Sequence, residues 1–551
     1  MTQQPPERFS DSPALALRGP TCPWSAWQWA VLAALFLAGL WMRVHALSAE
    51  GFADDEIHKW LAANRYLHGD FGGDDIEHPM LMKWCITGSI LLGRALGWAP
   101  ETMVRLPCAL AGALCILAVA WLGRRLFGRF AGLSAAGLTA LSTTFIGYNR
   151  VAKEDAFVAF FATLMVLCVA EAKAAADDGR TTAQRRWEVW GAVLLGVTFA
   201  SKYFFFFCPI PPVAYLWLRS GGSAWYIPLR RWAGLIGIAF AVFAALNWIP
   251  FLPSSWAYQL AYFAEKKTIH GALFFMGHIF HNLPWHWLWG TPPWFYEVFW
   301  AVKHALPMVL LSAIGLVLAV WRRAPSHRVL LTWLGFPLVA LTISGSKWGR
   351  FFESFFPCFA LLAGYAAAAM VRWVRTRAVS PWQPVTAGLV LLLVPWAAEA
   401  RAALAHAPHY RLYVSMLGGG DRNLDWFFPH CDYFDAGFRE AVQAVAVAAE
   451  PGAELVSEID WLARYYAERF GRPDLVPTML RPDEACRAPR VCYVVVQTGR
   501  LYFQNEEAVR ALAQRRPWHI ERVLGHEVVK VYRLSPGESP FPTKAVLFGG
   551  H

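Results

Sequence analysis

The chain has 551 residues, of which 56% are hydrophobic and only 16% are charged, and its net charge is +11. Soluble domains carry about 25% charged residues, so this composition excludes a purely soluble protein and predicts one that crosses a membrane many times. A basic chain could bind nucleic acid. Here, however, the Arg and Lys residues stand in short clusters between apolar runs, as in membrane proteins with basic cytoplasmic loops. We therefore expect no nucleic-acid partner.

A polar segment at residues 1–25 comes first and is expected in the cytoplasm. It is followed by apolar stretches close to the roughly 20 residues that cross a bilayer as a helix. The first stretch lacks a small-residue cleavage site, so we interpret it as a retained span and not as a signal peptide. The apolar stretches predict about eleven spans, at 26–46, 104–122, 130–148, 155–172, 188–202, 203–218, 232–251, 306–321, 329–345, 351–371 and 384–398.

Basic residues orient these spans. With a cytoplasmic N-terminus, about 18 Arg and Lys residues fall in cytoplasmic segments, as the positive-inside rule requires. The predicted orientation depends on the interpretation of two segments. Residues 188–218 are interpreted as two short helices with Lys202 at the outer tip, and residues 81–99 as a helix that lies against the outer interface without crossing. Two long outer loops follow, at about 48–103 and 252–305.

The composition changes after the last span. Residues 405–551 alternate between helical and strand-like patterns and are expected to form a soluble α/β domain on the outer side. The chain is therefore predicted to combine an all-α polytopic membrane domain, at 26–400, with a C-terminal α/β domain. Cys486 and Cys492 could form a local disulfide in an oxidising compartment. The expected elements are helices at 438–449, 460–470 and 506–515, strands at 453–459 and 491–497, and a strand pair at 523–534.

Three consecutive acids, Asp54, Asp55 and Glu56, follow the first span. Adjacent carboxylates at a membrane surface repel one another and lose solvation unless water or a cation compensates. They could simply begin a solvated helix, where acids favour the helix dipole. They could also provide a catalytic base and a helper carboxylate that deprotonate an acceptor hydroxyl.

A second polar motif stands before the 81–99 segment. Glu77 and His78 precede Pro79, which begins a new element, and Lys83 lies within about one helical turn of it. These residues could form an ordinary helix entry or part of a binding site.

Further polar residues stand at the outer ends of other helices. Arg150 and Asp155 open one span, and a salt bridge between them would offset the cost of the buried acid. Lys202, Lys347 and Arg350 are cations that could extend to lipid headgroups or bind a phosphate. The orientation depends mainly on cytoplasmic charge and apolar length, and these motifs nevertheless all fall on one face. They predict a site with acids for an acceptor and cations for an anionic donor.

These motifs resemble those of the GT-C superfamily of membrane glycosyltransferases, near its protein O-mannosyltransferase and aminoarabinose-transferase branches. The resemblance covers about residues 28–400. Met80 stands where the family usually has a second Pro, and the C-terminal domain is not explained by the resemblance. The matching pieces, in chain order, are Asp55-Glu56, His78-Pro79-Met80-Leu81, Arg150 to Asp155, Ser201-Lys202-Tyr203, Pro293-Trp294-Phe295-Tyr296 with Lys303, and Arg350-Phe351-Phe352.

The resemblance implies an inverting transfer of a sugar from a polyprenyl-phosphate donor to an acceptor hydroxyl on the outer face. Asp55 would be the base, Asp54 could share or replace that role, and Glu56 would orient the acceptor or the base. The other candidate residues would bind donor or acceptor or brace the outer loops. They are Glu77, His78, Lys83, Arg150, Asp155, Lys202, Lys347 and Arg350.

The expected partners are a polyprenyl-phosphate sugar, a protein, lipid or glycan acceptor, and membrane lipids. No Gly-rich nucleotide fingerprint is evident, and the sequence requires no cofactor. A divalent metal could still bind Asp54, Asp55, Glu56 and Glu77. The expected location is the bacterial inner membrane, with the site and the C-terminal domain outside the cytoplasm.

Two other functions remain open. A transporter for lipid-linked sugars should place charges at mid-membrane depth and show inverted repeats, but here the charges are terminal and no repeat is visible. A noncatalytic envelope assembly protein would not need acidic residues and phosphate-binding cations to converge on one site.

Overall fold

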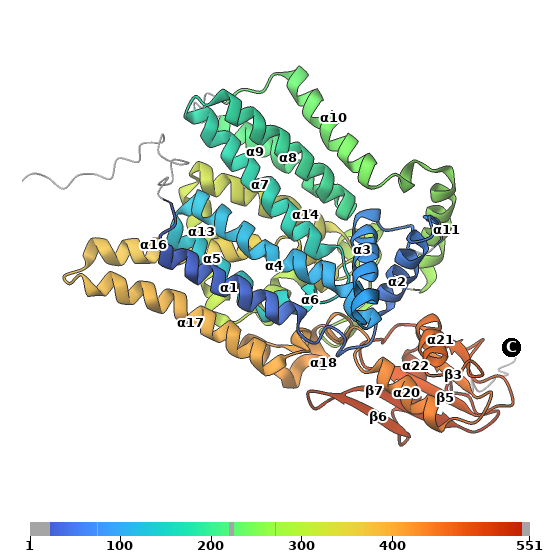
Figure 1. Cartoon of the computed structure of the whole chain (residues 1–551). Helices are drawn as coiled ribbons and strands as arrows, with labels where there is room; N and C mark the ends of the chain where they lie inside the picture. The colour runs from blue at the N-terminus through green and yellow to red at the C-terminus, as the bar shows by residue number, and fades with distance from the viewer. Residues whose placement is uncertain (1–22, 74, 220–224, 270, 543–551) are drawn as a thin grey trace, which may run out of the picture.

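The computed structural model describes residues 23–73, 75–219, 225–269 and 271–542. A bundle of long helices is followed by a small α/β unit at one end of the bundle (Figure 1). The predicted combination of a helical membrane domain and a C-terminal α/β domain is confirmed. Most of the predicted cytoplasmic N-terminus, residues 1–22, lies outside the described residues.

Within the described ranges, seven helices are long and apolar enough to cross a membrane. They are α1 (Ala26–Val44), α4 (Pro100–Phe127), α7 (Asp155–Asp177), α10 (Leu229–Leu246), α14 (Pro325–Ile343), α16 (Phe356–Arg377) and α17 (Trp382–His406). An eighth would be the pair α5 (Arg129–Leu141) and α6 (Thr143–Asn149), which is bent by 59°. Three more predicted spans overlap the shorter or less apolar helices α8 (Thr181–Ser201), α9 (Ile210–Arg219) and α13 (Leu306–Arg322). The count of eleven spans stays a prediction.

The segments between the long helices form smaller elements. They are α2 (Asp54–Tyr66), α3 (Met80–Leu96), α11 (Pro253–Ile269), the antiparallel pair β1 (Ala272–Phe275) and β2 (His278–His281), α12 (Phe295–Lys303) and α15 (Gly349–Glu353). Of these, α2 and α3 lie at the end of the bundle that faces the α/β unit (Figure 1).

Helix α3, which coincides with the ambiguous 81–99 segment, begins and ends at the same end of the bundle. Near its start, Lys83 lies 3.5 Å from Asp75 in the preceding loop. Near its end, Gly93 lies against Met103, at the start of α4. That start reaches the α/β unit, because Glu101 forms an ion pair with Arg469 at 2.7 Å. This geometry agrees with a helix that does not cross.

The hairpin predicted around Lys202 is also present. The Lys202 ammonium donates to Asp155, at the start of α7, at 2.7 Å. Helix α9 then runs back, because the Trp217 carbonyl near its end accepts a hydrogen bond from Arg328, at the start of α14, at 3.1 Å. Lys202 therefore lies at a reversal of the chain, at the same end of the bundle as Asp155.

The α/β unit is built on a five-stranded sheet with the strand order β4-β3-β5-β7-β6. The central strand β5 is almost entirely buried, which explains its continuous run of apolar residues. The predicted disulfide between Cys486 and Cys492 is confirmed. The elements are α18 (Leu424–Phe427), α19 (Pro429–Tyr433), α20 (Phe438–Ala448), β3 (Glu454–Ser457), α21 (Asp460–Arg469), β4 (Val476–Met479), β5 (Cys492–Gln497), α22 (Glu506–Leu512), β6 (His519–Val523) and β7 (His526–Leu534).

Hydrogen bonds to the loop between α1 and α2 hold this unit against the bundle. Arg439 of α20 donates to the carbonyls of Ser48 and Ala49 at 3.0 Å. Arg411 forms an ion pair with Glu50 at 2.6 Å. These contacts place the sheet beside the acidic residues that begin α2.

Candidate active site

Asp55 lies in the first turn of α2, where a negative charge is favoured by the helix dipole. It forms an ion pair with Lys153, from the loop before α7, and its Oδ2 lies 3.9 Å from the Arg350 guanidinium. The Asp55 side chain remains 32% exposed. The sequence predicts that Lys347 and Arg350 both lie near Asp55, and the structure shows this contact for Arg350. The arrangement combines an accessible carboxylate with two cations that are largely buried.

Lys153 and Arg350 also line a hollow beside Asp55, together with Tyr148, Val151, Cys431 and Phe434. The pKa of Lys153 lies well below its usual range, because burial penalises the ammonium and the nearby Arg350 repels it. Two basic side chains therefore border this hollow.

Asp54 points to the α/β unit instead. Its carboxylate accepts a hydrogen bond from Trp461 Nε1 at 3.0 Å and lies 3.3 Å from the Arg500 guanidinium. Its backbone N–H donates to Asp435 at 2.9 Å. The two adjacent acids therefore have different partners. The sequence alone did not distinguish their roles.

Glu56 is buried and forms a clamp between three segments. It accepts two hydrogen bonds from Arg105 of α4, at 2.9 and 2.5 Å. It also accepts the backbone N–H groups of Ala53 and Ala152, at 2.9 and 2.7 Å. All these partners belong to the protein itself. The bonds therefore hold the loop before α2 against α4 and against the loop that carries Lys153.

Arg150 and Asp155 do not form the expected pair with each other. The Arg150 guanidinium donates to four backbone carbonyls of the chain that leaves α1, those of Met42, Arg43, His45 and Ala46. Asp155 is bound by Lys202 and accepts a hydrogen bond from Ser354 at 3.3 Å. The pair is absent because the unsatisfied carbonyls at the end of α1 occupy Arg150.

The sequence model of the dolichyl-phosphate-mannose-protein mannosyltransferase family matches residues 77–249. The crystal structure of the Archaeoglobus fulgidus oligosaccharyltransferase in its apo form has a similar fold, with a TM-score of 0.51 at 15% identity over 82% of this chain and 64% of that chain. Residues 77–249 are thus similar in sequence to a glycosyltransferase family, and the chain has a fold similar to that of an oligosaccharyltransferase. Both findings support the predicted resemblance to the GT-C superfamily.

A second solved structure was also matched. ArnT from Cupriavidus metallidurans, bound to undecaprenyl phosphate, matches 92% of this chain and 98% of its own, at 14% identity and a TM-score of 0.48. A search among curated proteins finds no match.

A second charged cluster surrounds Asp75, between α2 and α3. Its carboxylate lies 3.4 Å from Lys59, 3.5 Å from Lys83 and 2.7 Å from His78 Nδ1. Glu77 is held by the Tyr258 hydroxyl at 3.0 Å. Burial alone would raise the pKa of Asp75, but Lys59, His78 and Lys83 hold it below its usual range.

The residues predicted to share a metal do not converge as a group. Asp54, Asp55 and Glu56 point to different partners. Asp75, Glu77 and His78 have ligand atoms within 4.8 Å of one another. However, two ammonium groups already contact the Asp75 carboxylate, which disfavours a divalent cation there. The fit to a metal is therefore poor at both places.

Lys347 is buried and joins its own loop to the loop before α12. Its ammonium donates to the carbonyls of Thr291, at 2.9 Å, and Ser344, and its backbone N–H donates to Asn282 at 2.7 Å. Among the described residues, the cations in ion-pair contact with Asp55 are Lys153 and Arg350. Lys153 was not among the predicted site residues, although it stands inside the Arg150-to-Asp155 motif.

Proposed function

We propose that the chain transfers a sugar from a polyprenyl-phosphate donor to an acceptor hydroxyl at the outer face of the membrane, with inversion at the sugar carbon. The observation that carries this proposal is the contact of Asp55 with Lys153 and Arg350 beside a hollow. It supports a base and two cations for an anionic leaving group within one site. The matching family is named for a dolichyl-phosphate sugar donor, which supports the donor class.

The reaction would be a single displacement. Asp55 takes the proton of the acceptor hydroxyl, and the acceptor oxygen forms a bond to the anomeric carbon of the sugar. The bond from this carbon to the phosphate oxygen breaks, and its electron pair stays on the lipid phosphate. Lys153 and Arg350 stabilise that charge. Attack opposite the leaving group inverts the configuration.

Donor binding would also activate the base. Without an anion in the hollow, both cations face Asp55, and ion pairing makes a carboxylate a weaker base. A phosphate between Lys153 and Arg350 would compete with Asp55 for them. The Asp55 carboxylate would then be released toward the acceptor only when the donor is present. This order would limit wasteful hydrolysis of the donor.

Basic residues support the orientation. The turns at the far end of the bundle from Asp55 carry clusters of Arg and Lys, as expected for cytoplasmic loops. We propose that the far end faces the cytoplasm of a bacterial cell, and that the site and the α/β unit lie outside its inner membrane. The residues are Arg124, Arg125, Arg129, Lys173, Arg180, Arg322, Arg323, Arg328, Arg372, Arg375 and Arg377.

The test uses the full chain in lipid nanodiscs with a panel of polyprenyl-phosphate sugars and acceptors from the cell envelope. Mass spectrometry of envelope glycans and glycoproteins, with and without the protein, selects the acceptors. We expect Asp55→Asn to lower the release of polyprenyl phosphate by about 10²- to 10⁴-fold, the usual range for a general base. The matched variant Asp54→Asn should retain activity within about tenfold, since Asp54 faces the α/β unit.

Full activity of Asp55→Asn would contradict the assignment of the base. Movement of the donor across sealed vesicles without release of polyprenyl phosphate would show a transporter instead.

A further inference from the structure

Lys59, in the middle of α2, forms a second charged contact between this helix and the loop that carries Lys153. Its ammonium lies 3.1 Å from Glu154, and the two side chains are only 0% and 1% exposed. Asp55 and Lys59 are four positions apart in α2, so they lie on the same face of the helix. The two ion pairs on this face have opposite polarity, because α2 supplies the acid of the first and the cation of the second.

Glu154 is a buried acid that needs a cation. Burial by itself would raise the pKa of Glu154, but the charge of Lys59 and of other nearby cations holds it below its usual range. Glu154 therefore carries a negative charge. A buried charge that loses its partner is strongly unfavourable. Lys153 is the next residue along the chain and could supply a replacement.

The other cations near Glu154 are held more firmly than Lys153. Four basic side chains act on the Glu154 carboxylate, namely Lys59, His78, Lys153 and Lys202. His78 contacts Asp75 at 2.7 Å and Lys202 contacts Asp155 at 2.7 Å, and both of these acids are at most 3% exposed. Asp55, the partner of Lys153, is 32% exposed, so water can replace its cation at lower cost. Glu154 is therefore a potential competitor of Asp55 for Lys153.

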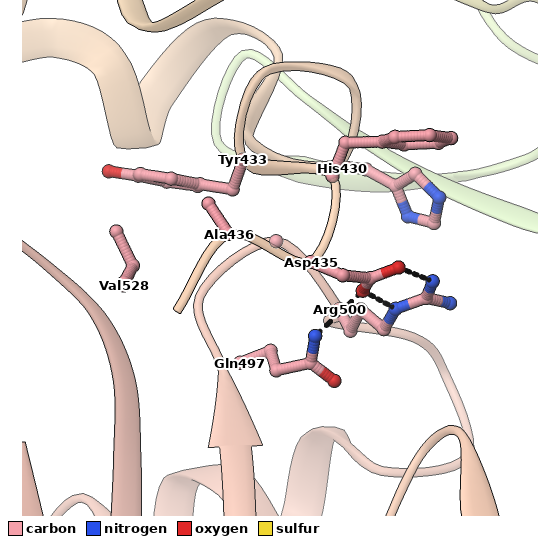
Figure 2. Close-up of a pocket in the computed structure, with 9 residues that line it drawn as sticks. His430, Tyr433, Asp435, Ala436, Gln497, Arg500 and Val528 are labelled. Atoms are coloured by element: carbon pink, nitrogen blue, oxygen red, sulfur yellow. Dashed lines mark hydrogen bonds and ion pairs between the residues drawn. The ribbon is translucent and has the colours of Figure 1, made fainter. Parts of the chain in front are cut away.

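The start of α2 is fixed from the side of the α/β unit. Asp435 accepts the backbone N–H of Asp54 at 2.9 Å. Figure 2 shows Arg500 and Gln497 both reaching Asp435, which holds this carboxylate in place. Asp55 is the next residue after Asp54, so it is anchored and cannot follow a cation that moves away.

We propose that Lys59 is a positioning residue for the transfer reaction: by binding Glu154, it leaves Lys153 in contact with Asp55. The inference rests on the proposed function, because it assigns Lys59 a part in that reaction. With Glu154 occupied, Lys153 exchanges only between Asp55 and the donor phosphate. Without Lys59, the buried carboxylate would take Lys153, and one of the two cations for the leaving group would be lost.

The position of Lys153 can be measured without any substrate, by cryo-electron microscopy of the full chain in nanodiscs with a bound antibody fragment. In Lys59→Met we expect Lys153 Nζ to lie about 3 Å from the Glu154 carboxylate and to leave Asp55. Adding Glu154→Gln should return Lys153 to Asp55, because a neutral amide binds an ammonium less strongly than a carboxylate does. Both chains lose the 3.4 Å contact of Lys59 with Asp75, so the difference between them isolates Glu154.

Steady-state kinetics of the same chains tests the effect on turnover. Lys59→Met should lower kcat by about tenfold and change the donor KM by less than about threefold, because Lys153 stabilises charge that develops in the transition state. Adding Glu154→Gln should restore kcat to within about threefold of the wild type. Glu188→Gln is the matched control, since it removes a buried glutamate that Arg231 binds at 3.0 Å near the start of α8. Added to Lys59→Met, it should restore nothing.

Thermal unfolding identifies variants that fail to fold. Lys59→Gln, whose amide can still donate to Asp75, replaces Lys59→Met in that case. The proposal is overturned if Lys153 stays on Asp55 in the folded Lys59 variant, or if kcat is unchanged. A loss of kcat that Glu154→Gln does not restore would also overturn it, and would show a purely structural role. If Lys153 moves as expected but the wild type has no transferase activity, the proposed function fails, and Lys59 remains the residue that positions Lys153.

Discussion

Arg500 lies 3.3 Å from Asp54 Oδ2, although the two residues are 446 positions apart in the sequence. The same guanidinium binds Asp435, so one side chain joins the α/β unit to the first turn of α2. Asp55, the proposed base, is the next residue along the chain. The C-terminal unit is thus a structural part of the candidate site.

This contact predicts a specific pattern of stability. Arg500→Gln should destabilise the protein by about 3–5 kcal/mol, because it leaves the buried Asp435 carboxylate without its cation. Asp435→Asn in the same chain should restore much of the loss. Thermal unfolding in detergent measures both. Arg510→Gln is the control, since Arg510 pairs with Glu506 on an exposed surface and should cost about 1 kcal/mol or less. A double variant no more stable than Arg500→Gln would contradict the pairing.

The two cations beside Asp55 should act on turnover. We expect Lys153→Gln and Arg350→Gln each to lower kcat by about 10²-fold or more, as for removal of one group that stabilises a transition-state charge. Steady-state kinetics with the polyprenyl-phosphate donor measures the effect. Lys530→Gln, in β7 of the α/β unit, is a matched control and should leave kcat unchanged. Activities within threefold of the wild type in both variants would exclude the cations from the reaction.

Glu458 predicts a pH dependence of stability. It is 7% exposed, and burial raises its pKa to about 7 despite the hydrogen bond from Asn505 and the charge of Arg500. Between its unfolded pKa of about 4.3 and about 7, the unfolded chain loses this proton and the folded chain keeps it. Stability should therefore fall as the pH rises through this window, and Glu458→Gln should remove that part of the fall.

The measurement is thermal unfolding of wild type and Glu458→Gln between pH 5 and pH 8. The difference should approach about 3 kcal/mol in favour of the variant at the upper end, since one pKa unit corresponds to about 1.4 kcal/mol. Parallel profiles for the two proteins would show that Glu458 does not titrate in this way.

The disulfide between Cys486 and Cys492 tests the orientation in the membrane. Disulfides persist outside the cytoplasm and are rare within it, so the pair should be oxidised in growing cells. Alkylation before and after reduction, followed by mass spectrometry, detects this state. Cys208 is free and exposed and serves as the thiol control. A pair that is alkylated without reduction in intact cells would place the α/β unit on the cytoplasmic side.

The positive charges of Lys153 and Arg350 lead us to predict that turnover does not depend on a metal ion. We expect EDTA to leave donor turnover within about twofold, because two protein cations already face the leaving group. Restoration of a lost activity by Mg²⁺ or Mn²⁺ after chelation would contradict this. The variant Asp75→Asn would then show whether the cluster with Glu77 and His78 holds the ion.

The local features of this protein could be predicted from its sequence. Helices of the bundle follow from apolar length, and α20, α21 and β5 follow from periodicity, because these properties depend on neighbouring residues alone. The same holds for Asp55 at a helix start and for the Cys486–Cys492 pair, which is six residues apart. Strand β4 was missed, since its Val476–Met479 segment is short, contains a Pro and lies at the edge of the sheet.

Only the tertiary structure decided which charged groups meet. The sequence offered Lys202, Lys347 and Arg350 as equal candidates, but Asp155 holds Lys202 and loop carbonyls hold Lys347. The positions of Lys153 and Arg500 beside the acidic motif result from the packing of segments that are distant in the sequence. Ion pairs of this kind depend on distances of a few ångströms, which no local pattern contains. The acidic motif could therefore be recognised in the sequence, whereas the cations that contact it depend on the fold.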